Sequence, residues 1–177
     1  DLFVALQGGN YDGAAFVASA AQSGAVAALV KATNYRNVGS PCPLLLVEDT
    51  RLALGRLAAH WRTQFNIPVI AVTGSNGKTT VKEMLASILR AATSDDDAVL
   101  ATLGNLNNDI GVPLTLLKLR AMHRYAVIEM GMNHKGEIEY LTRLAQPDVA
   151  IVNNAGSAHL AGLGSVDAVA RAKGERS

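Results

Sequence analysis

Gly77, Lys78 and Thr79 could together bind a phosphate, because they stand where an apolar strand gives way to a helix. Residues 69–72 are apolar and mostly β-branched, which predicts a short buried strand. Backbone N–H groups in the following turn and at the start of the helix converge on an anion. The lysine adds a positive charge for the outer phosphates, and the threonine hydroxyl can bind the accompanying magnesium. The stretch therefore predicts a nucleotide-binding loop.

The loop departs at one position from the general pattern G-x-x-x-x-G-K-[ST]. That pattern has glycine at position 72, where this chain has Val72, so its first glycine is Gly74. A Gly-Lys-Thr turn also arises by chance, but here a strand and an amphipathic helix are both readable on its flanks. The residues expected on the apolar face of that helix are Val81, Met84, Leu85, Ile88 and Leu89. The residues expected to bind ATP are Thr73, Gly74, Ser75, Asn76, Gly77, Lys78, Thr79 and Thr80.

Length and composition limit the possible classes of protein. The 177 residues fit one domain, or one domain and part of another, and the net charge of +1 gives no sign of a nucleic-acid-binding surface. Cys42 is the only cysteine, so no disulfide forms within the chain, which is compatible with a reducing cytosol. No apolar run approaches the length of a transmembrane helix. We therefore expect a cytoplasmic protein with no nucleic-acid partner and no membrane insertion.

Apolar runs alternate with helical periodicities along the chain, which predicts parallel strands joined by helices. Thr50 is the expected N-cap of a helix that ends before Pro68. We predict an α/β protein in two domains. Residues 1–66 would form a small N-terminal α/β unit, and residues 67–177 a P-loop-type domain with a mostly parallel sheet flanked by helices. Strands are expected at residues 2–6, 25–30, 44–47, 69–72, 99–102, 125–129 and 149–152.

Two further side chains could hold magnesium beyond the carboxyl ends of these strands, where such sheets bind ligands. Glu129 ends an apolar strand, the position of the metal-binding carboxylate in nucleotide-hydrolysing folds. The alternative is an ordinary solvated glutamate, and the phosphate loop favours the metal role. His159 follows the loop after the last strand, and both a metal ligand and a structural histidine stay open for it.

Lys173 lies on the apolar stripe of a short predicted helix that Ser165 can cap. Such a lysine either extends its amine into solvent at the helix end or is held in a site, and both readings stay open. A partly buried amine has more of its neutral form, which can capture carbon dioxide as a carbamate. The carbamate would turn a cation into an anion that binds metal.

The stretch from Thr73 to Thr80 resembles the phosphate loop of the Mur ligase family, whose members join amino acids to the peptidoglycan precursor. The family's loop also lacks the early glycine. The opening residues 2–6 and Asp12-Gly13 are similar to the N-terminal domain of the members that attach D-alanyl-D-alanine. Four further stretches resemble the same members, and they are residues 104–113, 129–134, 153–159 and 172–175. The resemblance covers almost the whole chain.

The resemblance implies roles for individual residues. Thr79 and Glu129 would hold a first magnesium ion, and His159 and a carbamylated Lys173 would serve a second. The uridine end of the substrate would lie on the N-terminal unit. The catalytic residues would be Lys78, Glu129, His159 and Lys173. The residues that face the substrate would be Asn105, Asn107 and Asn108.

Two departures from the family pattern bear on these roles. Ala14 stands where many relatives have histidine after Asp-Gly, and Arg176-Ser177 replaces the apolar continuation after Gly-Glu. The chain also lacks an initiator Met, and the C-terminal domain of the family, which supplies the dipeptide site, is absent. We therefore expect a monomeric fragment that is inactive alone.

The implied activity is ATP- and magnesium-dependent ligation of D-alanyl-D-alanine to UDP-N-acetylmuramoyl-tripeptide through an acyl phosphate. One alternative is another Mur-type or folylpolyglutamate-type ligase, against which the asparagine-rich loop argues. The other is a non-catalytic nucleotide-binding module, which would need no second metal. His159 and Lys173 discriminate between that module and a ligase.

Overall fold

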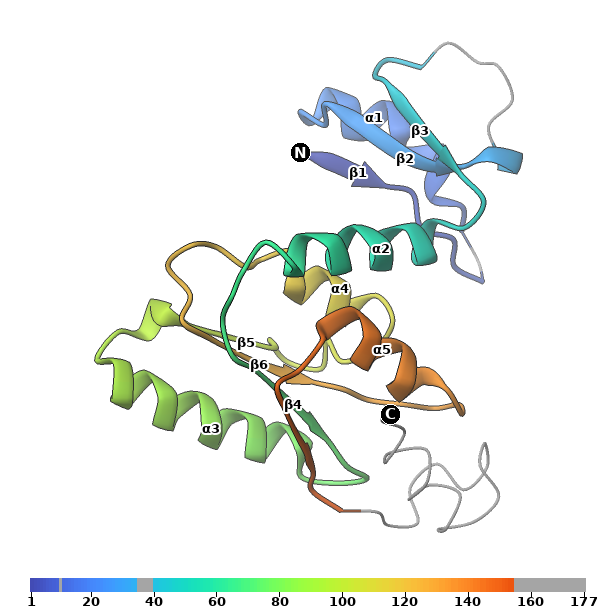
Figure 1. Cartoon of the computed structure of the whole chain (residues 1–177). Coiled ribbons are helices and arrows are strands. Elements are labelled where there is room, and N and C mark those ends of the chain that lie inside the picture. The colour runs from blue at the N-terminus through green and yellow to red at the C-terminus, as the bar shows by residue number, and fades with distance from the viewer. Residues whose placement is uncertain (10, 35–39, 155–177) are drawn as a thin grey trace. The chain divides into compact units, whose positions relative to one another are not determined.

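A computed structural model of the chain describes residues 1–9, 11–34 and 40–154 (Figure 1). The chain divides into two compact units, Asp1–Leu54 and Gly55–Ser177, and each has its own parallel sheet. Parallel strands joined through helices confirm the predicted α/β class. Within the described ranges, no helix is both long enough and apolar enough to cross a membrane.

The first unit is a parallel sheet in the order β1-β2-β3 over a small core. Its strands are β1 (Leu2–Val4), β2 (Ala27–Lys31) and β3 (Leu44–Val47). Its helices are α1 (Val17–Gln22) and the 3-10 turns η1 (Gly13–Phe16) and η2 (Ala32–Asn34). The first strand is shorter than predicted, because the Leu6 N–H turns back to the Val4 carbonyl at 2.9 Å. The core cluster of this unit is formed by the buried residues Ala5, Val17, Ala28 and Val30.

The Asp12-Gly13 pair begins η1 with a tight turn. The Asp12 carboxylate accepts from the Ala14 N–H at 3.0 Å, and the Gly13 N–H donates to the Leu6 carbonyl at 3.0 Å. A Cβ atom on Gly13 would lie 2.5 Å from the Leu6 carbonyl oxygen. The turn therefore needs glycine for close backbone approach.

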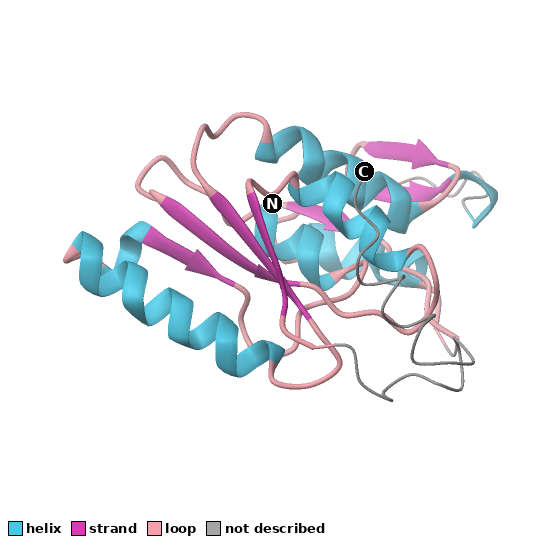
Figure 2. Cartoon of the chain, turned by 60° about the horizontal axis from the view of Figure 1, so that its bottom comes forward, coloured by secondary structure: helices cyan, strands magenta, loops and turns pink. Residues whose placement is uncertain are grey.

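The second unit is built on a parallel sheet in the order β5-β6-β4-β7. Figure 2 shows its strands fanned by the usual twist. Its strands are β4 (Val69–Thr73), β5 (Val99–Ala101), β6 (Tyr125–Glu129) and β7 (Val149–Val152). Its helices are α3 (Lys78–Thr93), η3 (Asp96–Ala98), α4 (Gly111–Leu116) and α5 (Glu137–Ala145). Strand β4 lies between β6 and β7, where the strand order reverses, and ligands bind at the carboxyl end of such a strand.

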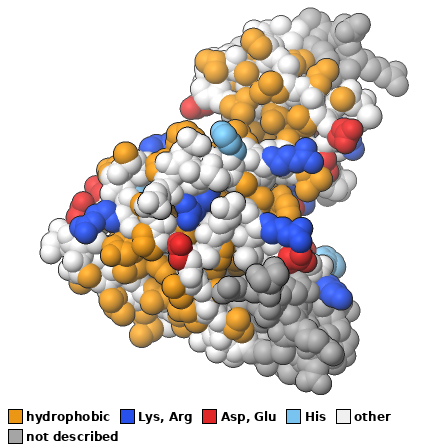
Figure 3. Space-filling view, in the orientation of Figure 1, with side chains coloured by type: hydrophobic (Ala, Val, Ile, Leu, Met, Phe, Trp, Pro, Cys, Tyr) orange, Lys and Arg blue, Asp and Glu red, His pale blue; other side chains and the backbone are white. Residues whose placement is uncertain are grey.

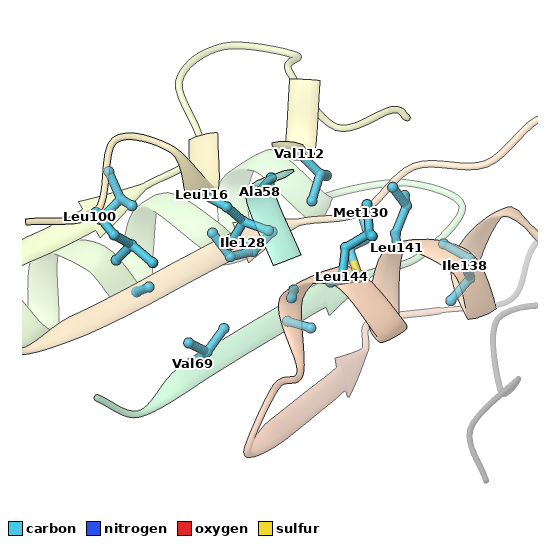
Figure 4. Packing of buried hydrophobic residues seen from close by; sticks show 14 of the residues in the cluster. Ala58, Val69, Leu100, Val112, Leu116, Ile128, Met130, Ile138, Leu141 and Leu144 are labelled. Carbon is cyan, nitrogen blue, oxygen red and sulfur yellow. The ribbon is translucent and has the colours of Figure 1, made fainter. Parts of the chain in front are cut away.

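Alternate residues of the central strands face opposite sides of this sheet. On one side Val72 and Val127 pack against α3. On the other side the larger core includes α4 and α5, and Figure 4 shows Leu141 of α5 beside Met130. Figure 1 shows the resulting layers, with α3 on one side of the sheet and α4 and α5 on the other.

The buried face of α3 differs from the predicted one. Met84 and Ile88 are 60% and 61% exposed, so their prediction as core residues was wrong, and Figure 3 shows hydrophobic side chains on the surface over this helix. The fully buried residues of α3 are Lys82 and Ala86, flanked by half-buried apolar residues. Val81, Leu85 and Leu89 of the predicted face do pack against the core, so the prediction holds for these three residues.

Helix α2 (Thr50–Arg62) begins one residue earlier than predicted, because its cap is Asp49 and not Thr50. The Asp49 carboxylate accepts from the N–H groups of Arg51 and Leu52 at 2.8 and 2.9 Å, which is the geometry of an N-cap. Thr50 is therefore the first helical residue.

The division between the units falls inside α2, whereas the sequence placed a domain boundary after residue 66. The C-terminal half of the helix packs on the second unit, where Ala58 is fully buried in the larger core. Trp61 Nε1 donates to the Leu119 carbonyl at 3.2 Å, and Arg62 Nε donates to the Ala145 carbonyl at 3.0 Å. These contacts assign residues 55–62 to the second unit.

Candidate phosphate-binding site

The phosphate loop leaves the carboxyl end of β4 and ends at the first residue of α3. Gly77 precedes the helix with φ of +72°, a conformation that favours glycine, and a Cβ atom there would lie 2.9 Å from Nδ2 of Asn153. Among the described residues no side chain caps the helix at Gly77, so the N–H groups of its first turn can donate to an anion. Lys78 Nζ donates to the Gly74 carbonyl at 2.9 Å, which holds the amine over the loop.

The eight residues predicted to bind ATP form this loop and the first turn of the helix. The buried ones are Thr73, Gly74 and Ser75, and Lys78 is half-buried. The exposed ones are Asn76, Gly77, Thr79 and Thr80. The loop is therefore anchored at its strand end and open at its helix end.

Two asparagines that follow β7 hold the middle of the loop. Asn154 Oδ1 accepts from the N–H groups of Ser75 and Asn76, each at 3.0 Å. The Asn76 carbonyl in turn accepts from Nδ2 of Asn153 at 2.8 Å and from Nδ2 of Asn154 at 2.9 Å. The side-chain amide of Asn154 is thus a neutral acceptor for two loop N–H groups, and it fixes the backbone around Asn76.

The structure brings Glu129 and Thr79 together. Glu129 ends β6 and is 2% exposed, and its Oε2 accepts from the Thr79 hydroxyl at 2.9 Å. Its other oxygen, Oε1, accepts from Nδ2 of Asn107 at 2.7 Å. The Glu129 N–H donates to the Thr102 hydroxyl at 2.9 Å. Both carboxylate oxygens and the backbone are therefore held, so this is not an ordinary solvated glutamate.

The donors at this point suit magnesium. A threonine hydroxyl and a carboxylate are hard oxygen ligands, and Mg²⁺ binds through one or two carboxylates together with substrate phosphates. Thr79 and Glu129 lie within hydrogen-bond distance of each other, at the start of the helix that would face the phosphates. In the described part of the chain, no three His, Cys, Asp or Glu side chains gather as a metal site, here or elsewhere.

The asparagine-rich loop folds over Glu129. The Asn107 carbonyl accepts from the Gly131 N–H at 2.8 Å, and a Cβ atom on Gly131 would lie 2.8 Å from Oδ1 of Asn107. Asn108 has a different task, because its Oδ1 accepts from the Gly111 N–H at 2.8 Å and caps α4. Asn105 is exposed. Of the three predicted substrate-facing residues, Asn107 is the one in contact with the candidate metal carboxylate.

Two site residues lie outside the described residues, and three others escaped the sequence analysis. His159 and Lys173 fall in residues 155–177, which the structure does not describe. The residues that were missed are Asn154, which contacts the loop, Thr102, which contacts Glu129, and Lys82, which contacts Thr102. A lysine on the apolar stripe of α3 was the one available sequence signal among them.

The sheet, the glycine-rich loop after its inner strand and the helix that begins at Lys78 define a phosphate-loop α/β domain. Residues 72–175, well over half of the chain, match the family described as the Mur ligase middle domain. The chain belongs to the Mur ligase family. The resemblance predicted from the loop is thereby confirmed.

Several relatives are similar over nearly the whole chain. The UDP-N-acetylmuramoyl-tripeptide–D-alanyl-D-alanine ligases of Haemophilus influenzae and Escherichia coli are each 52% identical over 98% of it. A crystal structure of MurF from Acinetobacter baumannii matches 98% of the chain with a TM-score of 0.88 and 48% identity. MurF from Thermotoga maritima, solved in complex with ADP, has a TM-score of 0.86 and 36% identity over 98% of the chain. The chain spans 37% of the length of the two ligases and of the first structure, and 39% of the second.

Proposed function

We propose that this chain is part of an ATP-dependent ligase that adds D-alanyl-D-alanine to UDP-N-acetylmuramoyl-tripeptide. The observation that carries the chemistry is the hydrogen bond from the Thr79 hydroxyl to the buried Glu129 carboxylate, directly after a phosphate loop. The choice of substrates rests on the names of two relatives that are 52% identical over 98% of the chain. Because the chain spans 37% of those relatives, the activity is proposed for the complete protein.

The residues of the loop suit transfer of the γ-phosphoryl group of ATP to a carboxylate. Lys78 and the N–H groups of the first turn of α3 would bind the outer phosphates. The tripeptide carboxylate attacks the γ-phosphorus, and the bond from this phosphorus to the β,γ-bridging oxygen breaks. ADP departs, and the tripeptide carries the phosphoryl group as an acyl phosphate. The amine of the dipeptide then attacks the acyl carbon, inorganic phosphate departs, the nitrogen loses a proton, and the amide forms.

Thr79 and Glu129 would hold the first magnesium ion, which when bound would neutralise charge on the phosphoryl group. Asn107 would keep the Glu129 carboxylate oriented through its Nδ2 donor. His159 and a carbamylated Lys173 remain the proposed holders of a second magnesium. The residues proposed to face the tripeptide remain Asn105, Asn107 and Asn108.

The first unit is proposed to bind the uridine end of the substrate. Its support is a separate sheet with the tight Asp12-Gly13 turn, together with its resemblance to the N-terminal domain of the family. Titration of the UDP-sugar tripeptide into isotope-labelled protein should shift NMR signals of residues 2–12. Shifts confined to residues beyond Pro68 would contradict this assignment. The proposed reaction also supports a cytoplasmic location, where ATP and UDP-sugars are available, and we expect a monomer on gel filtration.

Calorimetric titration of magnesium-ATP into Lys78→Ala tests the phosphate loop. We expect binding to be abolished, because backbone amides alone cannot replace the charge at the outer phosphates. Lys118→Ala removes the same charge from an exposed position after α4 and should bind as the unmodified chain does. Unchanged affinity in Lys78→Ala would refute the assignment.

The ligase activity itself is tested in a chain extended to the length of the relatives. Release of inorganic phosphate should require the UDP-sugar tripeptide and D-alanyl-D-alanine together. Release that needs a single amino acid in place of the dipeptide would support another Mur-type ligase instead.

A further inference from the structure

Lys82 is a fully buried lysine that the proposed reaction does not use. Its exposed fraction is 0%, and lysine is almost never buried without a partner. Nζ donates to the Thr102 carbonyl at 2.7 Å and lies 2.6 Å from Oε1 of Glu83, whose side chain is 57% exposed. The amine thus bonds inward to a strand end and outward to a carboxylate at the surface.

Thr102 is the residue directly after β5, and each of its polar groups is bonded. Its N–H donates to the Val127 carbonyl at 3.0 Å, and its hydroxyl accepts from the Glu129 N–H at 2.9 Å. Lys82 takes the remaining carbonyl. With an exposed fraction of 1%, Thr102 has little access to water as a substitute partner. Its position is therefore set jointly by β6 and by the Lys82 amine.

These bonds form a closed path that begins and ends on α3. Thr79 bonds to the side chain of Glu129, Glu129 bonds through its backbone to Thr102, and Thr102 bonds to Lys82. Thr79 and Lys82 are three residues apart, so they lie on the same face of the helix. The path fixes the Glu129 carboxylate relative to the phosphate loop from two directions.

We propose that Lys82 is a positioning residue, which holds Glu129 in register with Thr79 for magnesium through its hydrogen bond to Thr102. The inference rests on the proposed magnesium-ATP site and deepens it, since it names what keeps the two ligands together. Thr102 also begins the loop that carries Asn107, so the same bond anchors the second partner of the Glu129 carboxylate.

The test is calorimetric titration of ADP into the whole chain and into Lys82→Met, with magnesium and with a chelator. Methionine keeps the length and bulk of the side chain and removes the donor. Hydrogen-bonding partners of metal ligands typically contribute about tenfold or more to metal affinity or activity, and Lys82 acts on Glu129 through such a partner, Thr102. We expect the magnesium-dependent gain in ADP affinity to fall about tenfold in Lys82→Met. The affinity measured without metal should stay as in the unmodified chain, which a general loss of structure would not allow.

Two companion variants make the outcome decisive. Thr102→Val removes the hydroxyl that accepts from the Glu129 N–H, and it should lose the same magnesium-dependent gain. The double variant should lose no more than either single variant, because both act on one path. If Lys82→Met fails to fold, Lys82→Leu, which also removes the amine, is measured in its place. Glu83→Gln is the matched control, because it alters the surface partner of Lys82 and leaves the bond to Thr102.

A folded Lys82→Met that keeps the full magnesium-dependent gain would overturn the inference and leave the proposed function standing. Equal losses with and without metal would also overturn it, since they indicate a structural role only. Absence of any magnesium-dependent ADP binding in the unmodified chain would overturn both the proposed function and this inference.

Discussion

Asn154 shapes the phosphate loop although it lies 79 positions after Ser75 in the sequence. Its Oδ1 occupies the N–H groups of Ser75 and Asn76, which in an unclamped loop would be free to turn toward an anion. The N–H groups that remain for phosphate are therefore those at the start of α3. A neutral amide suits this place, because it orders the loop without adding negative charge beside the nucleotide.

Asn154→Asp should weaken nucleotide binding for that reason. A carboxylate would keep the two bonds from the Ser75 and Asn76 N–H groups, but it would lose the Nδ2 bond to the Asn76 carbonyl and add a negative charge close to the phosphates. At about 10 Å and the effective dielectric near a protein surface, a unit charge pair interacts by roughly 1–2 kcal/mol, about tenfold in affinity. Calorimetry with magnesium-ATP measures the loss. Asn154→Leu, which removes the bonds without adding charge, should lose less than Asn154→Asp, and equal affinities in Asn154→Asp and the unmodified chain would contradict the argument.

Single residues also mark where sequence reasoning succeeds and fails. The resemblance to the family implied that Thr79 and Glu129 share a magnesium ion, and the structure places the two side chains in hydrogen-bond contact. Asn154, Thr102 and Lys82 were missed because their partners lie 20 to 79 positions away, and no periodicity encodes such hydrogen bonds. The roles of His159 and Lys173 stay predictions.

At the scale of elements, the bounds of the helices and strands followed closely from periodicity and turn residues. Strands β3, β6 and β7 occupy the predicted residues, and the others differ at their ends. On α3, Val81, Leu85 and Leu89 pack against the core as predicted, but Met84 and Ile88 lie at the surface. Lys82 is buried through its bond to Thr102, a tertiary contact that hydropathy alone cannot reveal.

The start of α5 is held by its own first residue, Glu137. The carboxylate accepts from the N–H groups of Asn133 and His134 at 2.5 and 3.1 Å and lies 3.0 Å from Nδ1 of His134. Burial raises the pKa of the Glu137 carboxyl, but the two backbone donors and the His134 ring together lower that pKa below its ordinary value. The ionised carboxylate therefore stabilises the folded state.

Glu137→Gln should lower the melting temperature most at neutral pH. The contribution of a group with a lowered folded-state pKa is present above its ordinary pKa, near 4.3 for glutamate, and disappears as the pH falls through the folded-state value. The difference between Glu137→Gln and the unmodified chain should therefore shrink as the pH falls below about 4. Melting curves by circular dichroism across this range give the comparison. Glu139→Gln, which alters an exposed pair with Arg143 on the same helix, should have little effect at any pH, and a constant difference for Glu137→Gln would refute the linkage.

At the scale of the whole molecule, the division between the two units falls inside α2. The C-terminal half of this helix therefore contributes to the stability of the second unit. Ala58 is fully buried in the larger core, and the guanidinium of Arg62 donates to the Ala145 and Phe65 carbonyls. A second unit that began after residue 66 would lack these contacts.

A chain that begins at Asp49 should melt at a higher temperature than one that begins at Ile67. The longer chain keeps the Asp49 cap and the buried half of α2, and removal of large buried contacts typically costs about 2–5 kcal/mol. Thermal unfolding of both chains, followed by circular dichroism, makes the comparison. Equal melting temperatures would place the boundary after α2, as the sequence suggested.

Trp61, whose indole bonds to the Leu119 carbonyl, is the single tryptophan of the chain. Fluorescence excited at wavelengths longer than the tyrosine absorption band therefore comes from one place, where α2 packs on the second unit. Trp61 is 36% exposed, and its ring meets that of Phe65 edge-on with 5.3 Å between ring centroids. Release of the helix from the second unit would expose the ring to water and move its emission to longer wavelength. Unfolding of residues 1–54 alone would leave the emission wavelength unchanged. The chain thus has a built-in optical reporter that distinguishes loosening of this helix from melting of the first sheet, without any label.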